Sequence, residues 1–394
     1  MFIQTRLTNT LLFLLVVISI LLVTGCRDKV KKETRWDVYQ EPVEAKKLPA
    51  DSGVTELTEL WSRSVGGAGE AAFAILKPIY FNGAVFTASR NGTVSKFNAV
   101  SGEIIWKINT GSSIYAGVGA NEGIAAVVHD NGDLVAVNTT DGGVLWTAKL
   151  KRQISAIPVI GKGRVIVRTA DGLIIGLDST SGETKWEVKK SVPGFSIHGD
   201  STPTVTGDAV LVGLSNGRLI ANNVINGRDY WETEISFVRG KNEVERLSDA
   251  DTPPMVVGTT VFAGTYQGSI VALRLQNAEL IWRKSLSTRL PLAIFNRLLV
   301  VTEELGSIVA LDAASGDLLW QQDAFMGHGV SNPLIIGERI IIGDRNGRVH
   351  TLEATSGALI ETRKVVSGAI VGMIQNDRQF TVLSSEGDIS TLSL

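Results

Sequence analysis

The apolar residues of the chain recur in short alternating runs that are separated by tight turns. Runs such as "RVIVRTA" (164–170), "AVLVGLS" (209–215) and "RIIIGDR" (339–345) are rich in β-branched residues and are bounded by Gly, Asn or Asp. This pattern is typical of short β-strands joined by hairpins. Turns such as Asn91-Gly92 supply the positive φ that a tight hairpin requires. The pattern therefore predicts an all-β protein.

One turn glycine marks a unit that occurs eight times, at Gly92, Gly132, Gly172, Gly217, Gly268, Gly306, Gly347 and Gly387. A tryptophan lies fourteen residues after each of the first six, at Trp106, Trp146, Trp186, Trp231, Trp282 and Trp320. The seventh unit has Glu361 at that position. Fourteen residues before the glycine lie Pro78, Val118, Pro158, Pro203, Pro254 and Pro333, and Pro291 lies fifteen before Gly306. Each unit reads as four short strands, with the proline near the start of the first.

Four-stranded antiparallel units at a period near 40 residues bury both faces when they stack radially. The sequence therefore predicts an eight-bladed β-propeller, in which the tryptophans pack blade on blade and form core rather than a ligand site. The last unit lacks a fourth strand, and "TELTELW" (55–61) stands alone before the first. We expect this N-terminal strand, with Trp61, to complete the last blade and close the ring.

Residues 1–25 carry the pattern of a lipoprotein signal peptide. Leu11 to Val23 is an apolar run interrupted only by Ser19, too short for a comfortable membrane span. It ends in "VTGC" (23–26), which resembles a bacterial lipobox with Cys26 as the acylated residue, although Val23 replaces the more usual Leu. Arg27 at the next position implies sorting to the outer membrane. The alternative is an ordinary signal peptide followed by an incidental cysteine.

Residues 26–56 are then the lipidated cysteine and a polar tether without apolar periodicity, and residues 57–394 are the propeller. Composition narrows the function further. The net charge of −2 over 394 residues provides no basic field for nucleic acid. The four histidines are scattered, and the single cysteine excludes an internal disulfide and a CxxC site. We expect no catalytic residues, no metal site and no cofactor.

The connections between repeats differ in length, and the two longest are consecutive. They cover residues 187–202 and 232–253, whereas the spacing within each repeat is constant. Both should emerge on the same face of neighbouring blades. Long loops on a rigid scaffold are where such proteins usually bind partners.

The "SGEIIW" and "SGDLLW" endings resemble the quinoprotein (PQQ-type) propeller repeat, a resemblance that covers residues 55–394. The chain lacks the cysteine pair of quinoprotein dehydrogenases and shows no calcium-site cluster. Together with the lipobox, the tether and "ERLSDADTPP" (245–254), the repeat resembles the BamB family of the outer-membrane β-barrel assembly machinery (BAM complex).

That resemblance implies that the two long loops bind a periplasmic POTRA domain of BamA. The matching positions are Phe195, Ile197 and His198 in the first loop, and Arg246, Asp249 and Asp251 in the second. His198 replaces the usual Arg of the family. The alternative for the two aspartates is turn capping before Thr252-Pro253, and both roles are compatible.

The resemblance further implies a non-catalytic, palmitoylated lipoprotein on the periplasmic side of the outer membrane that assists β-barrel insertion. The resemblance also suggests unfolded outer-membrane proteins as a further binding partner. Two alternatives stay open: a PQQ-like propeller lipoprotein that binds another envelope partner, and a quinone-dependent periplasmic dehydrogenase.

Overall fold

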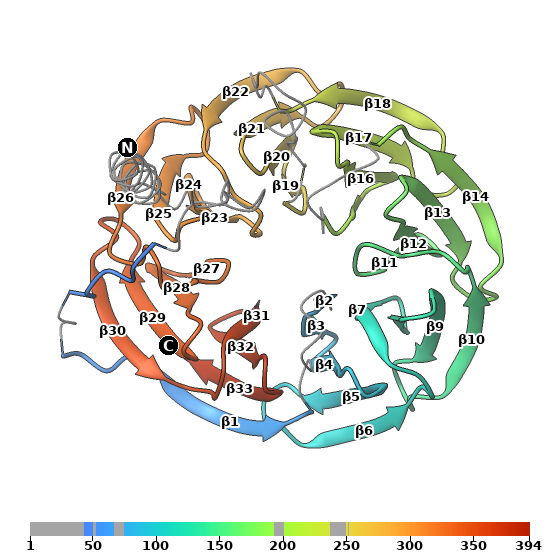
Figure 1. Cartoon of the computed structure of the whole chain (residues 1–394), viewed down its shortest axis with the longest axis horizontal. Helices are drawn as coiled ribbons and strands as arrows, with labels where there is room; N and C mark the ends of the chain where they lie inside the picture. The colour runs from blue at the N-terminus through green and yellow to red at the C-terminus, as the bar shows by residue number, and fades with distance from the viewer. Residues whose placement is uncertain (1–42, 50–52, 67–74, 193–200, 237–249, 251) are drawn as a thin grey trace, which may run out of the picture. The chain divides into compact units, whose positions relative to one another are not determined.

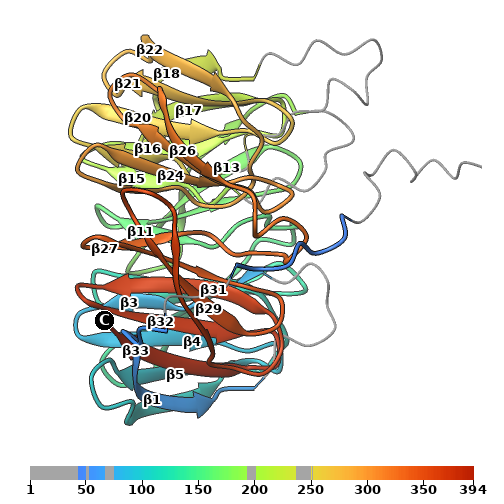
Figure 2. The same ribbon diagram turned by 90° about the vertical axis from the view of Figure 1, so that its left-hand side faces the viewer.

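A computed structural model describes residues 43–49, 53–66, 75–192, 201–236, 250 and 252–394. Residues 44–394 form one unit and are described by themselves. In this unit eight sheets, antiparallel apart from one short added strand, are arranged around a ring, which confirms the predicted all-β, eight-bladed β-propeller (Figure 1). Figure 2 shows the ring edge-on, with the strands running through its thickness. The described residues contain no helix of a length and hydropathy that would cross a membrane.

We number the blades along the chain and call the strands of each blade A to D from the centre outward. Blade 1 comprises β3 (Ile79–Phe81), β4 (Ala84–Ala88), β5 (Thr93–Asn98) and β6 (Ile104–Asn109). Blade 2 comprises β7 (Ile114–Asn121), β8 (Ile124–His129), β9 (Asp133–Asn138) and β10 (Val144–Lys149), and blade 3 comprises β11 (Val159–Gly161), β12 (Arg164–Arg168), β13 (Leu173–Asp178) and β14 (Thr184–Lys189). Blade 4 comprises β15 (Thr204–Thr206), β16 (Ala209–Gly213), β17 (Arg218–Asn223) and β18 (Asp229–Glu234).

Blade 5 comprises β19 (Met255–Val257), β20 (Thr260–Gly264), β21 (Ser269–Arg274) and β22 (Leu280–Ser285). Blade 6 comprises β23 (Ala293–Phe295), β24 (Leu298–Thr302), β25 (Ile308–Asp312) and β26 (Leu318–Gln322), and blade 7 comprises β27 (Leu334–Ile336), β28 (Arg339–Gly343), β29 (Arg348–Glu353) and β30 (Leu359–Lys364). Blade 8 comprises β31 (Ile370–Asn376), β32 (Gln379–Ser384), β33 (Asp388–Ser393) and β1 (Thr58–Ser64). Strand β2 (Ile75–Leu76) lies between β1 and β3 in the chain.

The N-terminal strand closes the ring, as the sequence predicts. β1 pairs antiparallel with β33, from Thr58 opposite Ser393 to Ser64 opposite Asp388. It is strand D of blade 8, the other three strands of which come from the C-terminal end of the chain. Figure 1 shows the blue β1 beside the red β33. Closure gives blade 8 four strands, as in blades 7 and 1 on either side of it.

Blade 2 departs from the predicted four strands, because β2 adds a fifth strand at its inner edge. β2 runs parallel to β7, and Ile75 lies opposite Ala116. The amide of Val118 donates to the carbonyl of Lys77 at 3.3 Å, and the amide of Lys77 donates to the carbonyl of Gly117 at 2.9 Å. In five other blades the repeat position of Val118 is a proline, which has no amide hydrogen to donate. The substitution of Val for Pro therefore permits the extra strand.

A tryptophan on strand D joins each of seven neighbouring blade pairs. In six of these pairs its ring covers a glycine in the C–D turn of the next blade, so closely that a Cβ added at Gly316 would lie 2.7 Å from Trp282; in the pair joined by Trp231 that turn position is Ala278. Its indole Nε1 donates to a backbone carbonyl of the same turn, at 2.8–3.1 Å in all seven junctions. Trp61 is 5% exposed and stacks on Phe97 at a centroid distance of 6.0 Å. The repeated tryptophan is core, as predicted.

The eighth junction, between blades 7 and 8, is built differently. Blade 8 has no C–D turn, because its strand D arrives from the other end of the chain. Glu361 occupies the tryptophan position on β30 and is 6% exposed. One of its carboxylate oxygens accepts the backbone amides of Glu56 and Leu57, at 2.8 and 3.0 Å. The departure from Trp at residue 361 thus provides an acceptor for the incoming chain.

Candidate interaction surface

One face of the ring carries the B–C turns and the connections from strand D to the next strand A; we call it the D–A face. The repeat glycine lies where these two segments cross. Backbone amides of the connections donate to the carbonyls of Gly92, Gly172 and Gly217 at 2.9 Å. A Cβ added at Gly132 would lie 2.3 Å from the carbonyl oxygen of Arg152. Both the contact and the positive φ of this turn require glycine.

The two long connections emerge on this face from consecutive blades. The first joins β14 to β15, between blades 3 and 4, and the second joins β18 to β19, between blades 4 and 5. Their bases are linked, since the hydroxyl of Ser201 donates to the carbonyl of Thr252 at 3.0 Å. The hydroxyl of Thr204 donates to the carbonyl of Pro254 at 2.7 Å. The two connections therefore share one foundation.

That foundation is buried and tightly packed. Ser201, Ala250 and Thr252 are 0–2% exposed. The hydroxyl of Thr252 accepts the amide of Gly264 at 2.6 Å. At the end of β16, a Cβ added at Gly213 would lie 2.4 Å from the carbonyl oxygen of Ala250 and 2.8 Å from the hydroxyl oxygen of Ser201. The ends of both connections are therefore held by the scaffold at fixed points.

Charged side chains brace the start of the first connection. The ammonium of Lys190 lies 3.1 Å from Asp229 and 3.2 Å from Glu232, across two blades. On blade 3, the ammonium of Lys189 bonds Asp171 at 2.7 Å. This hydrogen bond from Lys189, with a second from Thr169, lowers the pKa of Asp171. Ion pairs within blade 3 and between blades 3 and 4 thus hold the start of the first connection.

The residues that the sequence analysis assigns to binding lie outside the described residues. This holds for Phe195, Ile197 and His198, for Arg246, Asp249 and Asp251, and for the lipidation site Cys26. Their assignments stay predictions. What the structure provides is the frame that carries both predicted binding segments.

A third long connection was missed from sequence. It runs from the end of β1 at Ser64 to the start of β3 at Ile79, between blades 8 and 1. Trp61 and Pro78 are 17 residues apart, as far as Trp186 and Pro203. This equal spacing is the sequence signal for it, and it lies before the first complete repeat.

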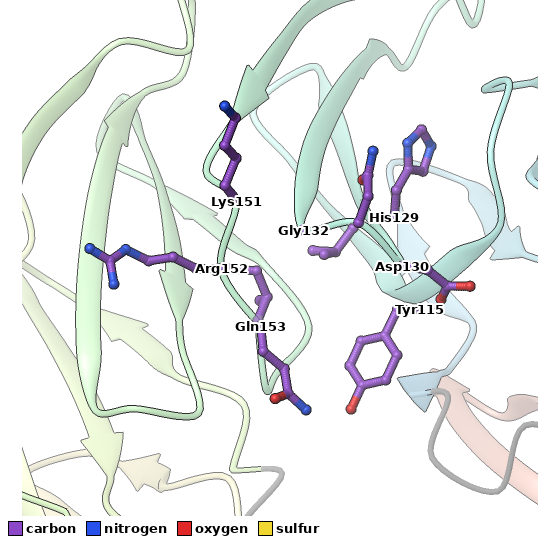
Figure 3. Close-up of a pocket in the computed structure, with 10 residues that line it drawn as sticks. Tyr115, His129, Asp130, Gly132, Lys151, Arg152 and Gln153 are labelled. Atoms are coloured by element: carbon purple, nitrogen blue, oxygen red, sulfur yellow. The ribbon is translucent and has the colours of Figure 1, made fainter.

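A cavity of about 450 Å³ opens on the D–A face between blades 2 and 3 (Figure 3). Its polar lining includes Tyr115, His129, Lys151, Arg152 and Gln153. Burial lowers the pKa of His129, against the opposing influence of nearby aspartates, and its Nε2 lies 2.9 Å from the hydroxyl of Thr110. Among the lining residues that the structure describes, Asp130 carries the single carboxylate.

The clearest buried titratable pair is structural. Asp344 and His350 are fully buried in blade 7, with Nε2 3.3 Å from the carboxylate. Burial alone would raise the pKa of Asp344, but the hydrogen bonds from His350 and from the backbone of Arg348 outweigh it and lower the pKa. The same carboxylate accepts the backbone amides of Asn346 and Arg348 at 2.8 and 2.9 Å, so Asp344 caps the B–C turn of blade 7. Within the described ranges, no three His, Cys, Asp or Glu side chains gather as a metal site.

Comparison with known proteins identifies the family. The family profile described as "Outer membrane protein assembly factor BamB" matches residues 90–322 and 304–393. The chain belongs to the BamB family. It is 43% identical over 320 residues to the BamB of Alkalilimnicola ehrlichii, covering 80% of this chain and 83% of that one. It is 39% identical over 350 residues to the Pseudomonas aeruginosa protein (89% and 90% covered) and 29% identical over 388 residues to that of Escherichia coli (96% and 97%).

Solved structures agree with this assignment. The crystal structure of BamB from Moraxella catarrhalis is similar with a TM-score of 0.78 and 26% identity, covering 86% of this chain and all of that chain. A quinohemoprotein alcohol dehydrogenase from Comamonas testosteroni is similar with a TM-score of 0.66 at 14% identity, covering 86% and 76%. The second likeness shows the propeller fold alone. The relatives of the family are named as assembly factors rather than as enzymes.

Proposed function

We propose that this chain is a non-catalytic scaffold of the β-barrel assembly machinery. In this proposal it is a lipoprotein of the outer membrane, faces the periplasm, and binds a POTRA domain of BamA. Membership of the BamB family supports the proposal, since relatives along nearly the whole chain are named outer membrane protein assembly factors. The observation that carries it is the shared, buried foundation of the two long connections on adjacent blades.

The binding mechanism follows from this foundation. A rigid base limits the conformational freedom that two loops lose when a partner binds, which improves affinity. Phe195 and Ile197 would supply the apolar centre of a small interface, and Asp249 and Asp251, with Arg246 beside them, its polar rim. His198 would make a weaker or pH-sensitive contact in place of the arginine of the family.

Calorimetry with a periplasmic fragment of BamA tests the docking residues. We expect Ile197→Glu and Asp249→Arg each to weaken binding more than tenfold, corresponding to about 2 kcal/mol or more. His198→Arg should leave binding intact or tighten it. The control is Ser285→Glu at the exposed end of β22, beside a short connection, which should change little. Unchanged affinity of both loop variants would place the docking surface elsewhere.

Lipidation is tested separately. Cys26→Ala should abolish acylation and leave a soluble or uncleaved precursor, because stable membrane attachment depends on the acyl chains. The propeller should still fold, as Cys26 lies outside it. Outer-membrane fractionation of this variant that resists high salt would contradict the lipobox assignment.

A further inference from the structure

The segment that leads into the ring is bound to the ring before it reaches β1. We call residues 44–49 and 53–57 the strap. Near its start, the amide of Lys46 donates to the carbonyl of Met326 at 3.1 Å. The ring Nε2 of His328 lies 2.7 Å from the carbonyl oxygen of Lys46 and must donate to it, since a carbonyl only accepts. Lys46 is thus held on both sides by the connection between blades 6 and 7.

The surface beneath the strap is a built site rather than open polar surface. His328 is 8% exposed, and its other nitrogen, Nδ1, has no hydrogen-bond partner within the described part of the chain. The next apolar residue of the strap, Leu48, packs against a hydrophobic cluster that includes Phe325 and Val330. Hydrogen bonds from Ser307 and Gln321 lower the pKa of Asp323, and the charge of Lys46 adds to this effect. Apolar, polar and charged contacts therefore hold the same short stretch.

The far end of the strap is bound on the opposite face. Arg339, at the start of β28, makes a bidentate pair with Glu56 at 2.7 and 2.8 Å. Arg363 donates to the carbonyl of Leu57 at 2.6 Å. The A–B turn beside Arg339 lies on the face away from the D–A connections. Figure 1 shows the two described pieces of the strap in blue, beside the outer side of blade 7.

We propose that the strap moves the departure point of the tether onto the D–A face, between blades 6 and 7. The proposal rests on the proposed lipid anchor at Cys26. It makes the D–A face, which carries the two long connections, the face turned toward the lipid surface. The lipid surface then lies opposite this face, and the two long connections are presented to BamA close to the membrane.

Chain dimensions show why the strap matters. From Cys26 to Glu44 are 18 residues, and a flexible chain of that length spans about 25 Å on average. Without the strap, the tether would extend to Leu57 and leave from the opposite face. A strand of six residues spans about 20 Å, so the two departure points differ by nearly the average span of the tether. The strap therefore biases which face approaches the bilayer.

Trypsin digestion of the chain from Cys26 onward tests binding of the strap directly, because cleavage can follow Lys46 and Lys47. We expect cleavage there to be at least tenfold slower than in a free peptide of residues 40–54. His328→Ala should accelerate it about tenfold. The matched control is His129→Ala, which removes another buried histidine that bonds Thr110 in blade 2 and should leave cleavage at Lys46 unchanged.

Two outcomes of the digestion would overturn the proposal. One is cleavage of the wild-type strap as fast as the free peptide, and the other is an unchanged rate in His328→Ala. If His328→Ala fails to fold, Lys46→Pro removes the amide that donates to Met326. It also removes the cleavage site after residue 46, so the acceleration is then expected after Lys47, compared with cleavage after Lys47 in the wild type. This measurement needs neither lipid nor BamA, so it is independent of the proposed function.

Energy transfer on vesicles tests the orientation. Lys151→Cys places a dye on the D–A face, and Ser101→Cys places one on a C–D turn of the opposite face; both positions are exposed. On phosphatidylethanolamine–phosphatidylglycerol vesicles with an acceptor lipid, lipidated protein should transfer more from residue 151 than from residue 101. Lys46→Pro should reduce this difference. Equal transfer from both positions would overturn the proposed orientation, whereas failure to bind vesicles would refute the lipid anchor and leave the digestion result standing.

Discussion

The junction between blades 7 and 8 solves the same packing problem as the other seven junctions with different chemistry. In the seven, an indole donates to a turn carbonyl, and in six of them its ring also covers a glycine of that turn. At the eighth no turn exists, and Glu361 accepts two backbone amides of the strap instead. In the seven junctions the side chain at the repeat position donates to a backbone carbonyl of the next blade. In the eighth, the side chain at that position accepts from backbone amides. The side chain at the repeat position follows from which backbone groups the neighbour leaves unpaired.

Removing the closing strand should have the largest effect on the free energy of unfolding. A chain that starts at residue 62 lacks Trp61 and the pairing of Thr58, Glu59 and Trp61 with β33, and it exposes an open strand edge in blade 8. Loss of Trp61 alone should cost about 3–5 kcal/mol, and the truncation should cost more. Urea unfolding measures the difference. A chain that starts at residue 43 is the control, since it keeps the strap and β1; a residue-62 chain that melts like this control would contradict closure.

Replacing the glutamate of the eighth junction by the tryptophan of the other seven should have the next largest effect on the free energy of unfolding. Glu361→Trp places the standard residue in the eighth junction, where it cannot accept the amides of Glu56 and Leu57. Two buried donors without partners should cost about 2–4 kcal/mol in the free energy of unfolding. Glu361→Gln keeps a carbonyl acceptor and should cost clearly less. A Trp variant as stable as the wild type would show that the junction selects for volume rather than for an acceptor.

The comparison also shows what the sequence can predict. The eight blades, the closing strand and the burial of the tryptophans follow from local periodicity and fixed spacing, as Trp61 and Trp106 illustrate. The absence of Trp at residue 361 is visible in the sequence, but its reason is not, because its hydrogen-bond partner is 305 residues away. The same holds for His328 and Lys46, which are 282 residues apart. Long-range pairs without a repeated spacing leave no local signal.

The candidate site divides in the same way. The number of residues between each repeat tryptophan and the next repeat proline predicts which blades are joined by long connections. The fifth strand of blade 2 depends on one amide, that of Val118, and on a partner in a connection that the repeat does not govern. The link between Ser201 and Thr252 joins two irregular segments. Residues at such points take their roles from the assembled scaffold rather than from their own neighbours in sequence.

The ion pair at the eighth junction should contribute a smaller, pH-dependent stabilisation. The hydrogen bond from Arg339 lowers the pKa of Glu56 below its ordinary value of 4.5. A lowered pKa on folding means that the stabilisation is present above that value and is lost as the pH falls through the folded pKa. Because both side chains are about a quarter exposed, 28% and 23%, we expect about 1 kcal/mol or less.

Urea unfolding of Arg339→Met checks this contribution. The destabilisation relative to wild type should be present at pH 7 and should shrink toward pH 3. Arg274→Met is the control, since Arg274 and Glu279 form a pair in which both side chains are 60% exposed and whose loss should change little. A difference for Arg339→Met that stays constant from pH 7 to pH 3 would show that the arginine acts by packing and not through the charge of Glu56.

The smallest expected effect tests the standard junction at its one irregular position. Ala278 occupies the place of the C–D turn glycine in blade 5, with a φ of 58°, which an alanine adopts at a cost of about 1–2 kcal/mol. Ala278→Gly relieves that conformation but adds freedom to the unfolded chain, which offsets about 0.4–1 kcal/mol of the gain. We expect a net stabilisation of about 0.5 kcal/mol, measured by urea unfolding. Gly316→Ala is the reverse change: its new Cβ would lie 2.7 Å from the ring of Trp282 and should destabilise by more than 1 kcal/mol, as strain and a clash combine. If Ala278→Gly destabilised the protein instead, the methyl group of Ala278 would be making a packing contact in blade 5 that outweighs the cost of its positive φ.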